Sequence, residues 1–153
     1  MQKVINLRLE LYSQCLAYAN QRIGTAQQAL DHAQESANTE EKSSAGDKYE
    51  TGRAMAHLER EKGLQQLSAA LKLKDVLDKI DPTSSSDRVT LGSIVITNSG
   101  NFYLAISAGQ LKVGDTEFIA LSPASPLGAL FNHKHVGDQV DFNKRNFLIH
   151  KIQ

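Results

Sequence analysis

The segment from residue 3 to residue 38 constrains the fold most, because it has no proline and carries apolar residues at a fixed spacing of seven. Two registers, three residues apart, share this spacing: Leu9, Leu16, Ile23, Leu30 and Ala37, and Tyr12, Ala19, Ala26 and Ala33. Paired registers of this kind are the a and d positions of a heptad repeat, which is typical of a coiled coil. The sequence therefore predicts one helix over residues 3–38, about 54 Å long, that buries both registers against a partner helix.

A polar break from Ser36 to Gly46 follows, and helical composition resumes from about Asp47 to Ile80. The apolar positions of this second segment are less regular: Met55, Leu58, Leu64, Leu67, Leu71, Leu73, Val76, Leu77 and Ile80. Two helices of similar length joined by a short break predict an antiparallel coiled-coil hairpin with the break at its tip. A structural coiled coil or a dimerisation arm fits the same periodicity.

Pro82 and the serine run of residues 84–86 indicate a linker, and the residue pattern after them changes from helical to β-type. We expect a hairpin over residues 1–80, a linker over 81–88 and a β-rich domain over 89–153, which makes the chain an α+β protein. The β-rich part should hold one short helix, beginning near Pro126, and five strands: 89–97, 101–107, 116–121, 139–142 and 146–152.

Composition excludes several classes of protein. The 17 basic and 17 acidic residues balance, so the chain lacks the basic footprint of a protein that grips nucleic acid by its phosphates. No apolar run approaches the roughly 20 residues that span a bilayer, and the N-terminus does not resemble a signal peptide. The single Cys15 cannot form an internal disulfide and sits in the first helix as a packing residue. We expect a cytoplasmic protein with no membrane partner.

The C-terminal part carries three motifs that resemble one family. They are Leu91-Gly92-Ser93 with Val95, the run from Ser122 to Leu130, and the run from Lys134 to Val140. Together they look like the second domain of the Gre transcript-cleavage factors, where a Ser-Pro segment opens a short helix and a Val-Gly-Asp turn follows. That domain has an FKBP-like fold, and the order of parts (helical hairpin, linker, β-rich domain) is similar across nearly the whole chain.

The resemblance implies a partner and a role. Gre factors bind bacterial RNA polymerase at its secondary channel, and acidic residues at the hairpin tip help hold a magnesium ion at the polymerase active centre. The polymerase then cuts backtracked RNA itself, so the factor is not an enzyme and meets nucleic acid only through the elongation complex. By resemblance, the residues that contact the polymerase are Ser122, Pro123, Pro126, Leu127, Gly128, Val136, Gly137 and Asp138. We expect no intrinsic cofactor, and a monomer.

The tip departs from the family pattern, and two alignments stay open. One matches Gly46-Asp47 and Glu50 to the family's Gly-Asp and Glu, which makes Asp47 and Glu50 the candidate magnesium-holding acids, in the complex with polymerase only. The other matches Tyr49 to the family's Tyr and puts Ala45 at the essential Glu, so that the acidic pair is lost. A structural role also fits, because Ser44 and Asp47 have the spacing of a capping box.

Three functions from different classes follow from these patterns. The chain is a Gre-like factor that stimulates cleavage, a Gre-like regulator that occupies the channel without cleavage, or a structural coiled-coil scaffold unrelated to transcription. The order of the parts disfavours the scaffold. The chemistry of the tip separates the first two.

Overall fold

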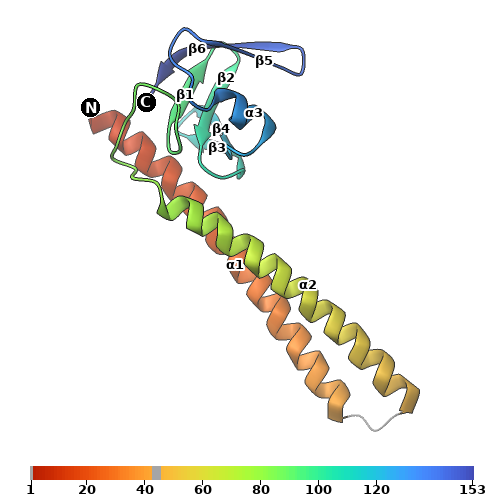
Figure 1. The fold of residues 1–153 in the computed structure, drawn as a ribbon. Coiled ribbons are helices and arrows are strands. Elements are labelled where there is room, and N and C mark those ends of the chain that lie inside the picture. The colour runs from red at the N-terminus through yellow and green to blue at the C-terminus, as the bar shows by residue number, and fades with distance from the viewer. Residues whose placement is uncertain (1, 43–45) are drawn as a thin grey trace. The chain divides into compact units, whose positions relative to one another are not determined.

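The computed structural model describes residues 2–42 and 46–153, with the backbone alone for residues 40–42 and 46–50. Two long helices come first, and a sheet with one short helix follows (Figure 1), which confirms an α+β chain. The helices are α1 (Gln2–Lys42), α2 (Gly46–Asp78) and α3 (Pro126–Phe131). The strands are β1 (Ile94–Thr97), β2 (Gly100–Leu104), β3 (Gly109–Val113), β4 (Thr116–Leu121), β5 (Gln139–Phe142) and β6 (Arg145–Ile152).

The first helix extends further than its sequence pattern predicts. The expected polar break began at Ser36, but α1 continues through Lys42. Nothing between Gly24 and residue 42 is a glycine or a proline, so the polar side chains there do not end the helix. The Thr39 hydroxyl donates to the Glu35 carbonyl oxygen (3.0 Å), a bond made within the helix. The second helix ends at Asp78, two residues before the predicted end.

Contacts divide the chain into two units. The first contains Met1–Tyr18 and Asp75–Gln153, and we call it the sheet unit. The second contains Ala19–Lys74, and we call it the hairpin unit. The sheet unit thus holds the first turns of α1 and the last turn of α2. The limits expected at residues 81–88 stay a prediction.

The hairpin unit is built on small side chains. The buried positions of α1 and α2 here are Ala19, Ala26 and Ala33, and Ala56, Gly63 and Ala70, each seven residues from the next. A Cβ atom added to Gly63 would lie 3.3 Å from the Leu30 Cα atom, so the two backbones approach closely at this point. The helices are therefore in contact through a seam of small residues, which we call the small seam.

The register of larger side chains, which begins at Leu9, is less buried than predicted. Leu16, Ile23 and Leu30 are only half-buried, and Leu9, at 42% exposed, is not in a seam at all. The prediction that Leu9 packs against α2 is wrong. In the hairpin unit the small register lets the backbones approach, so Ile23 and Leu30 lie beside the contact rather than in it. Near its start, α1 instead buries Leu11 and Cys15 in the sheet unit.

The sheet has six strands in the order β3-β4-β2-β1-β6-β5. Only β2 and β4 pair in parallel, with Phe102 opposite Ile119, and the other neighbours are antiparallel. The edge strand β3 was not predicted. It buries one side chain, Leu111, and an edge strand of this kind carries a weak hydrophobic pattern. The predicted strand from residue 89 is shorter than expected, because β1 begins only at Ile94.

Both faces of the sheet are covered within the sheet unit. One face carries a cluster with Phe102, Phe131 and Phe147 at its centre, whose ring centroids lie 5.1–5.8 Å apart. Phe131 comes from α3, so this short helix closes that face. Side chains alternate along a strand, and Tyr103 on the opposite face is fully buried and lies close to Cys15 of α1. The first turns of α1 therefore cover the second face.

Candidate functional site

The tip residues are positioned by the start of α2. Asp47 and Glu50 belong to α2, which begins at Gly46, and positions three apart share one side of a helix. The side chains of both acids lie outside the described set, as do Ser44 and Ala45. The choice between the two alignments of the tip, and the capping role of Ser44, therefore stay predictions.

Among the side chains that the structure describes, no three or more of His, Cys, Asp or Glu come together in a way that could hold a metal ion. Asp47 and Glu50 are not in that set, so magnesium at the tip stays a prediction. Two carboxylates suit magnesium, which takes one or two of them and keeps several waters.

The Ser-Pro segment is held by a capping network. The Ser125 hydroxyl donates to the Ser122 carbonyl oxygen (2.6 Å) and accepts from the Gly128 N–H (3.2 Å), so Ser125 is the N-cap of α3. Pro126 takes the first helical position, where its missing N–H costs nothing. A Cβ atom on Gly128 would lie 2.0 Å from the Ser122 carbonyl oxygen. Glycine is thus required at 128 for packing.

The Val-Gly-Asp segment is a turn fixed by backbone hydrogen bonds. Gly137 has a φ of +93° and donates its N–H to the Ile149 carbonyl oxygen (2.9 Å). The Asp138 carboxylate accepts from the His135 N–H (2.7 Å), and the Asp138 carbonyl accepts from the Ile149 N–H (3.0 Å). These contacts join the turn to β6. Gly137 and Asp138 therefore have a structural role whatever they contact outside the chain.

The eight residues expected to contact a partner divide into two groups. Ser122, Gly128, Gly137 and Asp138 hold the local backbone, and Leu127 is half-buried against the aromatic cluster. Pro126 and Val136 are exposed, Val136 by 56%, and Pro123 is half-buried. Leu130, which the sequence reasoning did not single out, is 41% exposed and belongs to the same helix as Pro126. Pro126, Leu130 and Val136 are the apolar side chains here that can meet a partner.

A group of buried titratable side chains lies where the first turns of α1 meet the sheet. Arg8 is 2% exposed, and its Nη1 atom donates to the Ser84 carbonyl oxygen. Its Nε and Nη2 atoms, like the Tyr103 hydroxyl, have no hydrogen-bond partner within residues 2–42 and 46–153. Burial lowers the pKa of Arg8 and raises the pKa of the Cys15 thiol to about 12. A thiol that stays protonated at neutral pH is not a nucleophile, so Cys15 is a packing residue.

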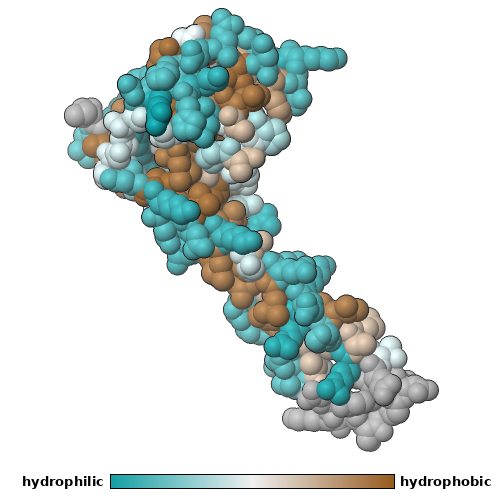
Figure 2. Space-filling view, in the orientation of Figure 1, coloured by the Kyte–Doolittle hydropathy of each residue, from teal (hydrophilic) through white to brown (hydrophobic). Residues whose placement is uncertain are grey.

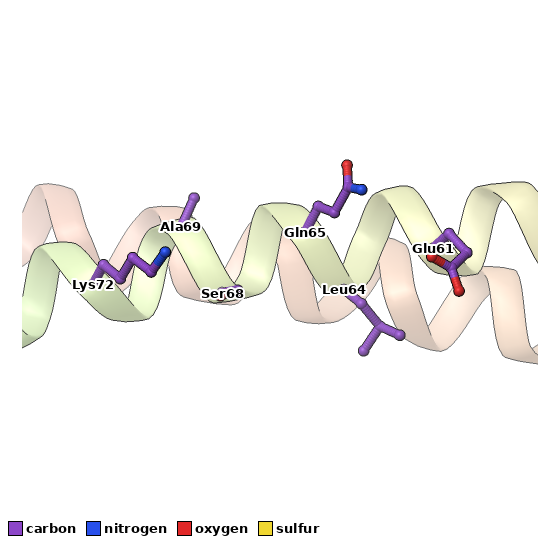
Figure 3. Close-up of a pocket in the computed structure, with 6 residues that line it drawn as sticks. All are labelled: Glu61, Leu64, Gln65, Ser68, Ala69 and Lys72. Atoms are coloured by element: carbon purple, nitrogen blue, oxygen red, sulfur yellow. The ribbon is translucent and has the colours of Figure 1, made fainter.

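The hairpin unit exposes apolar side chains along α2. Met55, Leu58, Leu64 and Leu71 are each exposed by 44% or more. Figure 2 shows apolar side chains interspersed with hydrophilic ones on the visible face of the two helices. One shallow groove on α2 is lined by Glu61, Leu64, Gln65, Ser68, Ala69 and Lys72 (Figure 3). This groove was not predicted from the sequence, although Leu64 is one of the apolar positions expected in the second helix.

No protein-family model matches this chain, and no curated protein matches it. Within the described ranges, no helix is long and apolar enough to cross a membrane.

Proposed function

We propose that this chain is a Gre-like transcription elongation factor that binds bacterial RNA polymerase and inserts its hairpin into the secondary channel. The sheet unit provides the docking surface, and the hairpin tip carries Asp47 and Glu50 to the active centre. The sheet unit, in this proposal, has the FKBP-like fold that the motifs at residues 91–95, 122–130 and 134–140 imply. The protein acts in the cytoplasm and has no catalytic activity of its own.

The observation that carries the proposal is the narrow construction of the hairpin unit. Its two helices pack through Ala19, Ala26 and Ala33 on one side and Ala56, Gly63 and Ala70 on the other. Small residues at every second turn of each helix let the helix axes approach the short end of the usual 8–10 Å separation. The 33-residue α2 is about 50 Å long. A pair of helices that is long, thin and covered by no other element of its unit suits entry into a narrow channel.

The second support comes from the residues near α3. The capping network of Ser125 and the turn at Gly137 hold the chain so that Pro126, Leu130 and Val136 stay exposed. Apolar side chains on a rigid frame are typical of contact surfaces between proteins. Replacing Val136 by Glu should weaken polymerase binding roughly tenfold or more, since an unpaired charge would then be buried at the contact. Ile119→Glu is the matched control, because Ile119 is an exposed apolar residue of β4 outside this group.

Magnesium bound at the polymerase centre supplies a Lewis acid that polarises the phosphate and activates water. This chain would contribute carboxylates from Asp47 and Glu50, three residues apart on α2. Two exposed carboxylates cannot offset the cost of dehydrating magnesium. The isolated protein should therefore bind magnesium very weakly, as isothermal titration calorimetry would measure.

A transcript-cleavage assay on backtracked elongation complexes tests the cleavage role. The wild-type chain should shorten the RNA, and Asp47→Asn should abolish that activity while polymerase binding persists. Glu59→Gln, an exposed acid elsewhere on α2, is the control and should keep full activity. If the wild-type protein binds and competes with a Gre factor but produces no cleavage, the alternative alignment of the tip is right and the protein regulates by occupying the channel. If it does not bind polymerase at all, the scaffold hypothesis takes its place.

A further inference from the structure

The groove on α2 has a chemical symmetry that neither the fold nor the proposed function explains. Its six lining residues come from three turns of one helix, with Glu61 at one end and Lys72 at the other (Figure 3). Between them lie Leu64 and Gln65 on the side of the acid, and Ser68 and Ala69 on the side of the base. We call this surface the α2 groove. All six residues belong to the hairpin unit and are exposed.

Reversing the direction of the helix about the middle of the α2 groove exchanges residues in complementary pairs. Glu61 changes places with Lys72, so opposite charges meet. Leu64 changes places with Ala69, so a large apolar side chain meets a small one. Gln65 changes places with Ser68, so an amide meets a hydroxyl that can hydrogen-bond with it. One twofold axis produces all three exchanges.

We propose that the α2 groove is a self-association surface, on which a second copy of this chain packs its own α2 in antiparallel orientation. A twofold contact repeats each favourable pair twice: two Glu61–Lys72 ion pairs and two Leu64 side chains, each seated at the partner copy's small residues. Twofold interfaces of this kind are the commonest in soluble oligomers. A parallel arrangement would instead place acid on acid and base on base, so the charges select the antiparallel one.

The strength of the contact follows from its size. Leu64 is 44% exposed and is the one large apolar side chain in the α2 groove, so the contact is small and polar. Contacts below the usual interface size are weak and transient. We expect a dissociation constant on the order of 100 µM, with a monomer at low micromolar concentration. Because the ion pairs are exposed, raising the salt concentration should weaken association.

Charge reversal gives a test with internal controls. Glu61 and Lys72 are 11 residues apart on one helix, about 16 Å, so they cannot pair within one copy. Glu61→Lys and Lys72→Glu should each weaken self-association about tenfold, because every ion pair becomes a repulsion. The double reversal should restore it. Mixing the two single variants should restore it as well, since one then carries two bases and the other two acids.

Sedimentation equilibrium from micromolar to millimolar concentration measures these effects on the full chain, with circular dichroism to show that each variant is folded. Leu64→Ala should weaken association, while Leu58→Ala, an exposed leucine of α2 outside the groove, should not. A wild-type chain that stays monomeric at millimolar concentration would overturn the proposal. So would a folded double reversal that associates no better than the single variants. Neither outcome bears on polymerase binding, which is measured separately.

Discussion

Gly63 gives the sharpest test of the small seam, because its nearest neighbours across the contact are atoms of Leu30. A Cβ atom at position 63 would lie 3.3 Å from the Leu30 Cα atom and 3.4 Å from its Cβ atom. The first distance is shorter than ordinary van der Waals contact and the second lies at its lower edge, and the nearest atom belongs to the backbone. Gly63→Ala therefore pushes α1 and α2 apart rather than turning a flexible side chain aside.

Two opposing terms set the size of the effect. Replacing glycine by alanine inside a helix gains roughly 0.5–1 kcal/mol of stability. Overpacking a close contact costs roughly 1–3 kcal/mol. The net effect of Gly63→Ala is then between no change and a loss of about 2.5 kcal/mol. Gly24→Ala isolates the first term, because a Cβ atom on Gly24 has nothing within 4 Å and Gly24 is also inside the hairpin unit.

Urea denaturation followed by far-ultraviolet circular dichroism measures the free energy of unfolding of both variants. Gly24→Ala should gain about 0.5–1 kcal/mol, and Gly63→Ala should fall below it by about 1–3 kcal/mol. Gly63→Leu should be worse again, whereas Gly24→Leu should be tolerated. Equal gains from alanine at positions 24 and 63 would refute close packing of the two helices.

Three further predictions concern the sheet unit. Burial raises the pKa of the Cys15 thiol from 9.0 to about 12. Between these pH values the unfolded chain binds fewer protons than the folded chain, so the free energy of unfolding should fall as the pH rises. Cys15→Ala should flatten this dependence of the unfolding free energy on pH. Tyr103→Phe should leave the free energy of unfolding unchanged or raise it slightly, because the buried hydroxyl has no hydrogen-bond partner in the described part of the chain. A loss above about 1 kcal/mol would reveal a partner, such as a buried water. Gly128→Ala should cost about 3 kcal/mol or more in thermal unfolding, because its Cβ atom would meet a carbonyl oxygen. Gly109→Ala should cost only about 1–2 kcal/mol, because Gly109 has a φ of +80° but open space around it. Similar losses at both positions would contradict the packing assigned to Gly128.

The hairpin could be predicted from sequence because a spacing of seven is a property of one helix by itself. The sequence of one helix does not show which of its two registers lies in the contact, because that depends on the partner helix. The partner register of Ala56, Gly63 and Ala70 is equally regular, but its small residues carry little hydrophobic signal beside the leucines of the same helix. Once both registers are small, the backbones approach, and the larger Ile23 and Leu30 are left half-buried.

In the sheet unit, β5 was predicted although it buries only Val140, whereas β3 was not predicted. Its pattern from Gly109 to Val113 has only Leu111 buried, and the Gly114-Asp115 turn that joins it to β4 is the one signal that could have revealed it. For the motifs near α3, the roles of individual residues could not be predicted from the sequence. Sequence alone does not separate Gly128, which the packing requires, from Val136, which lies on the surface, since that distinction is made by contacts with Ser122 and β6.

The central claim is that the hairpin tip reaches the polymerase active centre, and site-specific crosslinking tests it most directly. Asp47→Cys in a Cys15→Ala chain carries one thiol, at the tip, to which a photoactivated crosslinker can be attached. Asp115→Cys in the same background is the control, on an exposed turn of the sheet unit. In backtracked elongation complexes, position 47 should crosslink to the catalytic centre or to the RNA 3′ end, and position 115 should not. Binding to polymerase without a crosslink from position 47 to either target would contradict the claim.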